Sequence, residues 1–203
     1  MPEANNFFQI HHSDDRDFES CLSIYRTSFP EHEKQSEAVI KERVDGGLSM
    51  LFAGKDGDSI VCTCFIFDFM DSPFILLDYF AVTPAKRGTG TGTKFLAFLI
   101  DQLIGKKRFL VMEVEHPGFG SNVSERMARI KFYERSGAMI LHNTRYLLPP
   151  VTGKGEPVEM QLMIFPQPTT NFTCREINDL IMTIYREVYN RHESDPVLLS
   201  FLK

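Results

Sequence analysis

A glycine-rich stretch has the residue types and the spacing of an anion-binding loop. Gly88, Gly90 and Gly92 leave one side of the chain without Cβ atoms, so backbone N–H groups can approach a ligand closely there. The apolar run 74–82 before them predicts a buried strand, and the apolar-rich segment 94–104 after them predicts a helix. A helix start presents unpaired N–H groups and the positive end of its dipole. The stretch therefore predicts a phosphate or pyrophosphate site.

Two well-known phosphate-loop patterns fit this stretch incompletely. The pattern G-x-x-x-x-G-K-[ST] fails because Lys94 is neither preceded by glycine nor followed by Ser or Thr. The dinucleotide pattern G-x-G-x-x-G matches at its first two glycines but has Thr93 at the third. Its supporting acid, expected roughly 20 residues further on, would be Glu113 or Glu115. A dinucleotide site therefore stays an alternative interpretation.

Composition and charge limit the class of protein. The 203 residues are 43% hydrophobic and 12% aromatic, which is enough for one domain with a decoration and a real core. We see no basic-then-apolar leader and no apolar run of about 18 residues, which predicts a cytoplasmic protein without a membrane partner. A net charge of −5 without a basic cluster makes nucleic acid an unexpected partner. The cysteines form no C-x-x-C pair, so no metal site is predicted.

The pattern of apolar residues predicts a mixed α/β sheet. The expected strands are 6–12, 49–55, 59–69, 74–82, 109–115, 138–142 and 159–165, and the expected helices are 13–28, 33–44, 94–104, 124–136 and 174–192. Antiparallel strands come first and two strand–helix units follow. Residues 144–158 are expected to be a long loop. The glycine loop follows the fourth strand, whereas a dinucleotide-binding fold places it after the first.

Two sequence blocks resemble the GCN5-related N-acetyltransferase (GNAT) superfamily. Leu76-Leu-Asp-Tyr-Phe-Ala-Val82 leads into Arg87-x-x-Gly90-x-Gly92, which fits Q/R-x-x-G-x-G/A at every position. Residues 128–138, Ala-Arg-Ile-Lys-Phe-Tyr-Glu-Arg-Ser-Gly-Ala, resemble the helix A-x-x-x-x-Y-E-(K/R)-x-G-F. The resemblance implies an α/β, GNAT-like acyl-CoA N-acyltransferase fold over a domain 1–165. The segment 166–203 would then be a C-terminal helical extension, packed on the same domain or on a dimer partner.

The resemblance also implies acetyl-CoA as co-substrate, with no metal. In the family, the backbone at the end of the fourth strand binds the pantetheine arm between two splayed strands, and the following loop holds the pyrophosphate. Carried over, these cofactor-binding positions are Ala81, Val82, Arg87, Gly88, Thr89, Gly90, Thr91, Gly92 and Thr93. Arg126 stands where many relatives have asparagine, and Arg129 follows one turn later. These arginines either reach coenzyme-A phosphates or pair with Glu125 and Glu134.

The resemblance assigns Tyr133 as the general acid that protonates the departing thiolate, with a core tyrosine as the alternative. A phenol suits this role, because its ordinary pKa of about 10 keeps it protonated at pH 7. The family's glutamate base on the fourth strand would fall at Leu76 and is absent. A base is still useful, because an amine of pKa about 10.4 is neutral in only about one molecule in 2,500 at pH 7. Glu113 and Asp78 are the candidate bases.

The acceptor side is predicted only as a region. The family builds it from the first two helices and the loop before the last strand, and the substrate candidates here are Glu33, Glu115 and Tyr146. The leading hypothesis is an N-acetyltransferase that moves the acetyl group of acetyl-CoA to a primary amine by direct attack. A small molecule, a peptide N-terminus and a protein lysine all stay open as acceptors. The alternatives are a non-catalytic acyl-CoA sensor or scaffold of the same fold and a dinucleotide-binding oxidoreductase.

Overall fold

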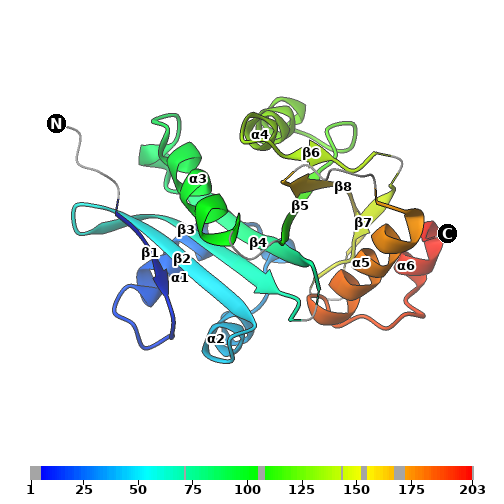
Figure 1. The fold of residues 1–203 in the computed structure, drawn as a ribbon, viewed down its shortest axis with the longest axis horizontal. Coiled ribbons are helices and arrows are strands. Elements are labelled where there is room, and N and C mark those ends of the chain that lie inside the picture. Colours follow the sequence, from blue (N-terminus) through cyan, green and yellow to red (C-terminus); the bar gives the residue numbers. More distant parts are fainter. Residues whose placement is uncertain are drawn as a thin grey trace. The chain divides into compact units, whose positions relative to one another are not determined.

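The computed structural model describes residues 6–70, 72–104, 108–142, 144–151, 155–166 and 172–202, with the backbone alone described at positions 32 and 104. The chain divides into two compact units, Met1–Arg108 and Phe109–Lys203. Both units combine strands with helices (Figure 1), so the mixed α/β class predicted from the sequence is confirmed. Within the described residues, no helix is both long enough and apolar enough to cross a membrane.

The strands of the first unit form an antiparallel meander. Their bounds are β1 (Asn6–Ile10), β2 (Ser49–Asp56), β3 (Ser59–Asp68) and β4 (Phe74–Val82), and each strand pairs with the next. The turn between β2 and β3 contains Gly57 with φ of 59°, a left-handed conformation that glycine adopts without strain. This meander brings the end of β4 next to β3, where Ala81 pairs with Thr63 and Val82 with Cys62.

Helices cover both faces of this meander (Figure 1). They are α1 (Phe18–Ser28), α2 (Glu37–Asp45) and α3 (Thr91–Ile104), with short 3-10 turns η1 (Glu31–Glu33) and η2 (Pro84–Lys86). On one face Tyr25 of α1 packs with Phe65 and Tyr79 of the strands. On the other face Phe95 of α3 packs 5.6 Å from the Phe80 ring. Consecutive residues of β4, Tyr79 and Phe80, thus serve opposite faces.

The first two helices start later than the sequence predicts. Ser13 was expected to cap the first helix, but α1 begins at Phe18, and the Ser13 backbone N–H and hydroxyl donate to the Asp45 carboxylate at 2.8 and 2.7 Å. The second helix begins at Glu37 rather than at Glu33, because the Ser36 hydroxyl accepts from the Val39 N–H and fixes the start there. In the first case the expected capping residue bonds to a distant carboxylate, and in the second a different residue caps the helix.

The second unit is organised around its last strand. Its strands are β5 (Phe109–Glu115), β6 (Met139–Ile140), β7 (Tyr146–Leu148) and β8 (Val158–Phe165), and β8 pairs antiparallel with each of the other three. Its helices are α4 (Val123–Arg135), α5 (Cys174–Glu187) and α6 (Pro196–Phe201). β7 lies inside the expected loop 144–158, and α6 was not expected at all. Both are too short to give a periodic signal.

The C-terminal helices pack on β7 within this unit. Thr173 and Glu176 form a capping box at the start of α5, whose apolar face buries four side chains, Leu180, Ile181, Ile184 and Tyr185. The Tyr185 hydroxyl donates to the Leu147 carbonyl, and the Phe201 ring of α6 lies 6.1 Å from the rings of Tyr146 and Tyr185. These contacts are intramolecular. The expected division at residue 165 and the dimer interface stay predictions.

Candidate active site

The loop after β4 combines two glycines in left-handed conformations with the start of a helix. Gly88 and Gly90 have φ of 74° and 85°, and a Cβ atom added at either position would meet nothing within 4 Å. The requirement for glycine is therefore one of backbone conformation and not of space. The Gly90 carbonyl accepts from the Lys94 N–H at 3.0 Å, so α3 starts at Thr91, three residues earlier than the sequence pattern predicted. The first N–H groups of α3 consequently belong to the loop itself.

Side chains of the loop bond mainly to their own backbone. Arg87 is exposed, and its Nε donates to the Val82 carbonyl at 3.1 Å. The Thr89 hydroxyl donates to the Lys86 carbonyl at 2.8 Å and lies 3.0 Å from the buried Thr91 hydroxyl. These bonds hold the loop in one conformation without using the N–H groups at the start of α3. The structure thus places Ala81, Val82 and the seven predicted loop residues in one continuous segment.

Asp78 lies at a bulge of β4. Leu77 pairs with Ile66 and Tyr79 with Phe65, so Asp78 is the extra residue between two consecutive partners. Its side chain is only 4% exposed, and Arg43 of α2 lies 3.5 Å from its carboxylate. Burial raises the pKa of Asp78 to about 6, and the nearby Arg43 charge opposes this rise. Arg43 could not be predicted as this partner, because it lies in a mostly polar helix 35 residues before Asp78.

Glu33 lies in a segment that two tyrosines fix to the meander. The Tyr79 hydroxyl donates to the Glu33 carbonyl at 3.0 Å and accepts from the Gln35 N–H at 3.1 Å. The Tyr25 hydroxyl donates to the Gln35 carbonyl at 2.8 Å. Burial is the main reason why the pKa values of both tyrosines lie well above their ordinary range. Both phenols therefore act as neutral hydrogen-bonding groups that position the predicted acceptor segment.

In the second unit, Glu113 of β5 receives two phenol hydrogen bonds. Tyr146 of β7 donates to its Oε1, and Tyr189, just after α5, donates to its Oε2 at 2.6 Å. Tyr146 is fully buried, and burial, followed by the nearby Glu113 charge, raises its pKa well above the usual value. Tyr146 is therefore a permanent donor. The predicted base and one predicted substrate residue are brought into direct contact.

Glu115 holds the two arginines that the sequence singled out. Arg126 and Arg129 of α4 pair with its two carboxylate oxygens at 2.8 and 3.1 Å. One of the two alternatives predicted for these arginines was pairing with Glu125 and Glu134, and in the structure both pair with Glu115 of β5. The Arg126 side chain is 13% exposed and also donates to the His116 carbonyl at 3.3 Å, whereas Arg129 is 49% exposed. Arg126 thus fixes the loop after β5, and Arg129 is the more accessible cation.

Tyr133 lies in the last turn of α4. It is 6% exposed, and its ring makes an edge contact with the Phe132 ring at 5.2 Å. Its carbonyl accepts from the Ser136 and Ala138 N–H groups, which end the helix. Gly137 follows the helix with φ of 91°, a left-handed conformation that glycine favours at a helix end.

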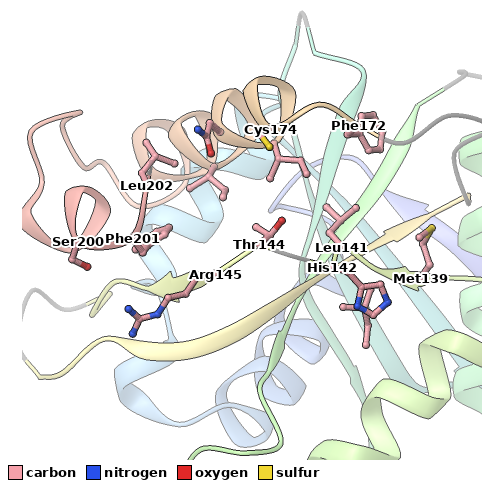
Figure 2. A pocket seen from close by; sticks show the side chains of 14 residues that line it. Met139, Leu141, His142, Thr144, Arg145, Phe172, Cys174, Ser200, Phe201 and Leu202 are labelled. Carbon is pink, nitrogen blue, oxygen red and sulfur yellow. The ribbon is translucent and has the colours of Figure 1, made fainter.

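A cavity of about 740 Å³ lies elsewhere in the second unit (Figure 2). Residues 139–142, 144 and 145, the start of α5 and the end of α6 line it, and Arg145 at its edge pairs with Glu159 at 3.2 Å. None of the predicted site residues lines this cavity. Within the described ranges no three His, Cys, Asp or Glu side chains are grouped as a metal ion would require. The metal-free reaction stays a prediction.

Tyr189 was not among the candidate site residues predicted from the sequence, although it lies within the expected helix 174–192. Tyr189 follows Tyr185 by four residues and so falls on the same side of a helix. That spacing was the available signal. What the sequence could not supply was the partner, because Glu113 is 76 residues away along the chain.

Comparison with known proteins places this geometry in context. A model of the acetyltransferase (GNAT) family matches residues 15–138, which is more than half of the chain. A Bacteroides thetaiotaomicron protein described as an acetyltransferase of the GNAT family superimposes with a TM-score of 0.76 and 25% identity, over 92% of this chain and 99% of its own. The ribosomal-protein-S18-alanine N-acetyltransferase from Escherichia coli superimposes with a TM-score of 0.59 and 20% identity, over 84% of this chain and 99% of its own.

Two further proteins are similar over smaller shares or at lower identity. A Salmonella typhimurium acetyltransferase structure, described as containing acetyl-CoA, has a TM-score of 0.60 and 14% identity over 84% of this chain and 99% of its own. An uncharacterized protein of Dictyostelium discoideum is 29% identical over 111 residues, which are 54% of this chain and 25% of that protein. The present chain thus matches about a quarter of the length of that curated relative.

Proposed function

Because the chain belongs to the GNAT family of acetyltransferases, we propose that it transfers the acetyl group of acetyl-CoA to a primary amine. The observation that carries this proposal is the loop after β4. Gly88 and Gly90 adopt positive φ angles and α3 starts immediately afterwards at Thr91, so several N–H groups are available for one pyrophosphate. The Salmonella relative that contains acetyl-CoA supports the same choice of ligand.

The proposed reaction is a direct attack of the amine on the thioester. A nitrogen–carbon bond forms and the carbon–sulfur bond breaks, with no covalent enzyme intermediate. The amine loses a proton to a carboxylate base and the departing thiolate takes a proton from the Tyr133 hydroxyl, so charges and atoms balance. Tyr133 keeps the role that the sequence block suggested, at the end of a helix that fixes its backbone.

Glu113 suits the base better than Asp78 does. The Asp78 carboxyl is 4% exposed and faces a guanidinium, so an acceptor has little access to it. Glu113 is half-buried, and each of its oxygens accepts from a phenol, which leaves lone pairs for an amine or a bridging water. We therefore assign Glu113 as base and Asp78 as a structural group of the β4 bulge.

The acceptor is proposed only as a class. Glu33, Glu115 and Tyr146 remain the candidate substrate residues, and small amines, peptide N-termini and protein lysines are all compatible with them. Arg87 and the loop residues to Thr93, with Ala81 and Val82, are the proposed acetyl-CoA contacts. Arg126 and Arg129 stay candidates at the phosphates. A cytoplasmic location also remains a prediction.

The function is tested by measuring thiol release from acetyl-CoA with three acceptors: a polyamine, a peptide with a free N-terminus and an N-blocked lysine peptide. Each has a fully acetylated control. We expect product with at least one acceptor. The variants Tyr133→Phe and Glu113→Gln should lower kcat by about 10²-fold or more, the usual contribution of one acid or base. Acetyl-CoA affinity should stay within about twofold, because neither group is proposed to bind it before reaction.

One alternative has an observation in its favour. Leu76, where the family's glutamate base would fall, is fully buried and apolar, which is compatible with an acyl-CoA sensor or scaffold without turnover. Tight acetyl-CoA binding with no product from any acceptor would favour that alternative. A kcat unaffected by Tyr133→Phe would refute the assigned acid while leaving the transferase activity itself intact.

A further inference from the structure

The C-terminal extension contributes directly to the surroundings of Glu113. The family model ends at residue 138, so α5 and the segment after it lie outside the matched region. Tyr189 nevertheless donates to Glu113 Oε2 at 2.6 Å, and Tyr146 donates to Oε1. The carboxylate thus has one donor from β7 and one from the extension, each on a different oxygen.

We propose that Tyr189 is a positioning residue for Glu113, and that the C-terminal extension thereby completes the base of the acetyltransferase. The proposal rests on the function proposed above. Two donors on two oxygens fix the rotation of the carboxylate plane about its last side-chain bond. They also favour the ionised form, which is the form that accepts a proton. A helix that only covered the core would have no such effect on the carboxylate.

The position of Tyr189 is itself fixed by its neighbours. Tyr185 and Val188 before it are 0% and 1% exposed, and the Tyr185 hydroxyl donates to the Leu147 carbonyl next to Tyr146. The Arg191 N–H donates to the Tyr185 carbonyl at 2.8 Å, and Asn190 takes φ of 51°, which ends the helix. Tyr189 is therefore held between a buried helix and a closed turn, so little conformational freedom is lost when its hydroxyl bonds to Glu113.

The ionisable groups near Glu113 lie on β5, β7, α4, α5 and the segment after α5. Tyr146 and Tyr189 touch it. Burial, then the Asp195 charge and then the Glu113 charge raise the pKa of Tyr185 on α5. On β5 itself, Glu115 is two residues further and is paired with both arginines of α4. Beyond α5, Arg191 lies 3.5 Å from Asp195. The hydroxyls of Tyr146 and Tyr189 donate directly to Glu113. The nearby charges of Glu115 and Arg191 are paired with the α4 arginines and with Asp195.

The test compares Tyr189→Phe with Tyr185→Phe. Both variants remove one hydroxyl from the same tyrosine cluster, but only Tyr189 bonds to Glu113, whereas Tyr185 bonds to a carbonyl. Two quantities are measured: the pH profile of kcat/KM and the NMR titration of the Glu113 side-chain carboxyl, assigned with Glu113→Gln. The NMR titration needs no turnover and therefore reports on the contact independently of the reaction.

In Tyr189→Phe we expect the carboxyl titration midpoint and the acid limb of kcat/KM to move together to higher pH. Loss of one hydrogen bond to a charged group predicts a movement of about one pH unit, or about tenfold in the acid constant. Tyr185→Phe should move both by less, because the Tyr185 hydroxyl bonds to the Leu147 carbonyl and not to Glu113. Replacing Tyr189 by 3-fluorotyrosine, a stronger donor of nearly the same shape, should move both to lower pH without removing any contact.

Either of two results overturns the proposal. One is an unmoved Glu113 titration in both position-189 variants, which would mean that the contact does not act on the carboxylate. The other is a moved titration with an unmoved acid limb, which would mean that Glu113 is not the base that Tyr189 positions. An absence of product with every acceptor would instead reject the transferase function, so the two failures are distinguishable.

Discussion

Three carboxylates of this protein have three different partners. Asp78 is buried beside one guanidinium, Glu113 accepts from two phenols, and Glu115 is shared by two guanidinium groups. A guanidinium neutralises a carboxylate by its full charge, whereas a phenol stabilises it by hydrogen bonding and adds no charge. The two phenol contacts of Glu113 therefore stabilise its negative charge without cancelling it, which suits a group that must attract or deprotonate an amine.

The buried Asp78 predicts a pH-dependent stability. Its folded-state pKa of about 6 lies above the ordinary 3.8, so the stability that it contributes is full below pH 4 and is lost as pH rises through 6. The free energy of unfolding of the wild type should fall by about 2.4 kcal/mol between pH 4 and pH 7, relative to Asp78→Asn. Urea unfolding of both proteins at several pH values measures this difference.

Arg43 is present in both proteins of that comparison, so its own burial cancels from the pH dependence. A difference in unfolding free energy that stays constant from pH 4 to pH 7 would show that Asp78 does not titrate in this range in the folded state.

Arg126 and Arg129, which both pair with Glu115, should contribute unequally to the free energy of unfolding. Arg126 is 13% exposed and also bonds to the His116 carbonyl, so Arg126→Met should cost about 2 kcal/mol of stability. Arg129 is 49% exposed, so Arg129→Met should cost less than about 1 kcal/mol. Thermal or urea unfolding checks both values, and equal losses would contradict the division of roles.

The same pair of variants separates the two interpretations of these arginines. If Arg129 binds a coenzyme-A phosphate, Arg129→Met weakens acetyl-CoA binding and the effect shrinks in high salt. An unchanged affinity would leave the ion pair with Glu115 as its whole role.

At the scale of elements, the glycine loop joins a strand to a helix through left-handed conformations. Gly90 has φ of 85° and Gly57, in the β2–β3 turn, has φ of 59°, and both would place a Cβ atom in open space. Gly90→Ala and Gly57→Ala should therefore lose similar stability, about 1–2 kcal/mol, through backbone strain. Only Gly90→Ala should weaken acetyl-CoA binding, by about tenfold if a similar strain energy opposes the bound loop.

Calorimetric titration of acetyl-CoA into both variants measures this effect, with unfolding curves to confirm that their stabilities are similar. A Gly57→Ala variant that loses affinity as strongly as Gly90→Ala would show that the loss comes from general destabilisation and not from the loop.

The longer elements could be predicted from the sequence because their patterns are local. β4 and β5 begin and end where their apolar runs do, and the hairpin at Gly57 follows from the Asp-Gly pair. β7 and α6 could not be predicted, because three and six residues are too few to show a period and their stability comes from distant partners. Tyr146 on β7, for instance, is buried by α5 and α6 side chains that are far along the chain.

Within the candidate site, contiguous motifs were predictable and long-range pairs were not. The loop from Arg87 to Thr93 could be predicted because its three glycines lie close together, at every second position of one short stretch. The Asp78–Arg43 and Glu113–Tyr189 contacts span 35 and 76 residues and depend on which faces the fold brings together. Composition and periodicity carry no information about such pairings.

For the whole molecule, membership of the GNAT family and the similarity to the Bacteroides structure confirm the fold expected from the sequence. The family match stops at residue 138, whereas the similarity to that structure covers 92% of the chain. The C-terminal extension lies outside the residues that the family model matches, and it provides Tyr189 to the candidate base. Homodimer formation through this extension stays a prediction.

The central claim is that this fold binds acetyl-CoA through the loop after β4. Calorimetric titration of the full chain with acetyl-CoA, with NAD and ATP as matched controls, tests it most directly. The account predicts saturable, micromolar binding of acetyl-CoA with one site per chain and no comparable binding of NAD or ATP. No binding of acetyl-CoA, or equal binding of NAD, would contradict the assignment of the loop and with it the proposed reaction.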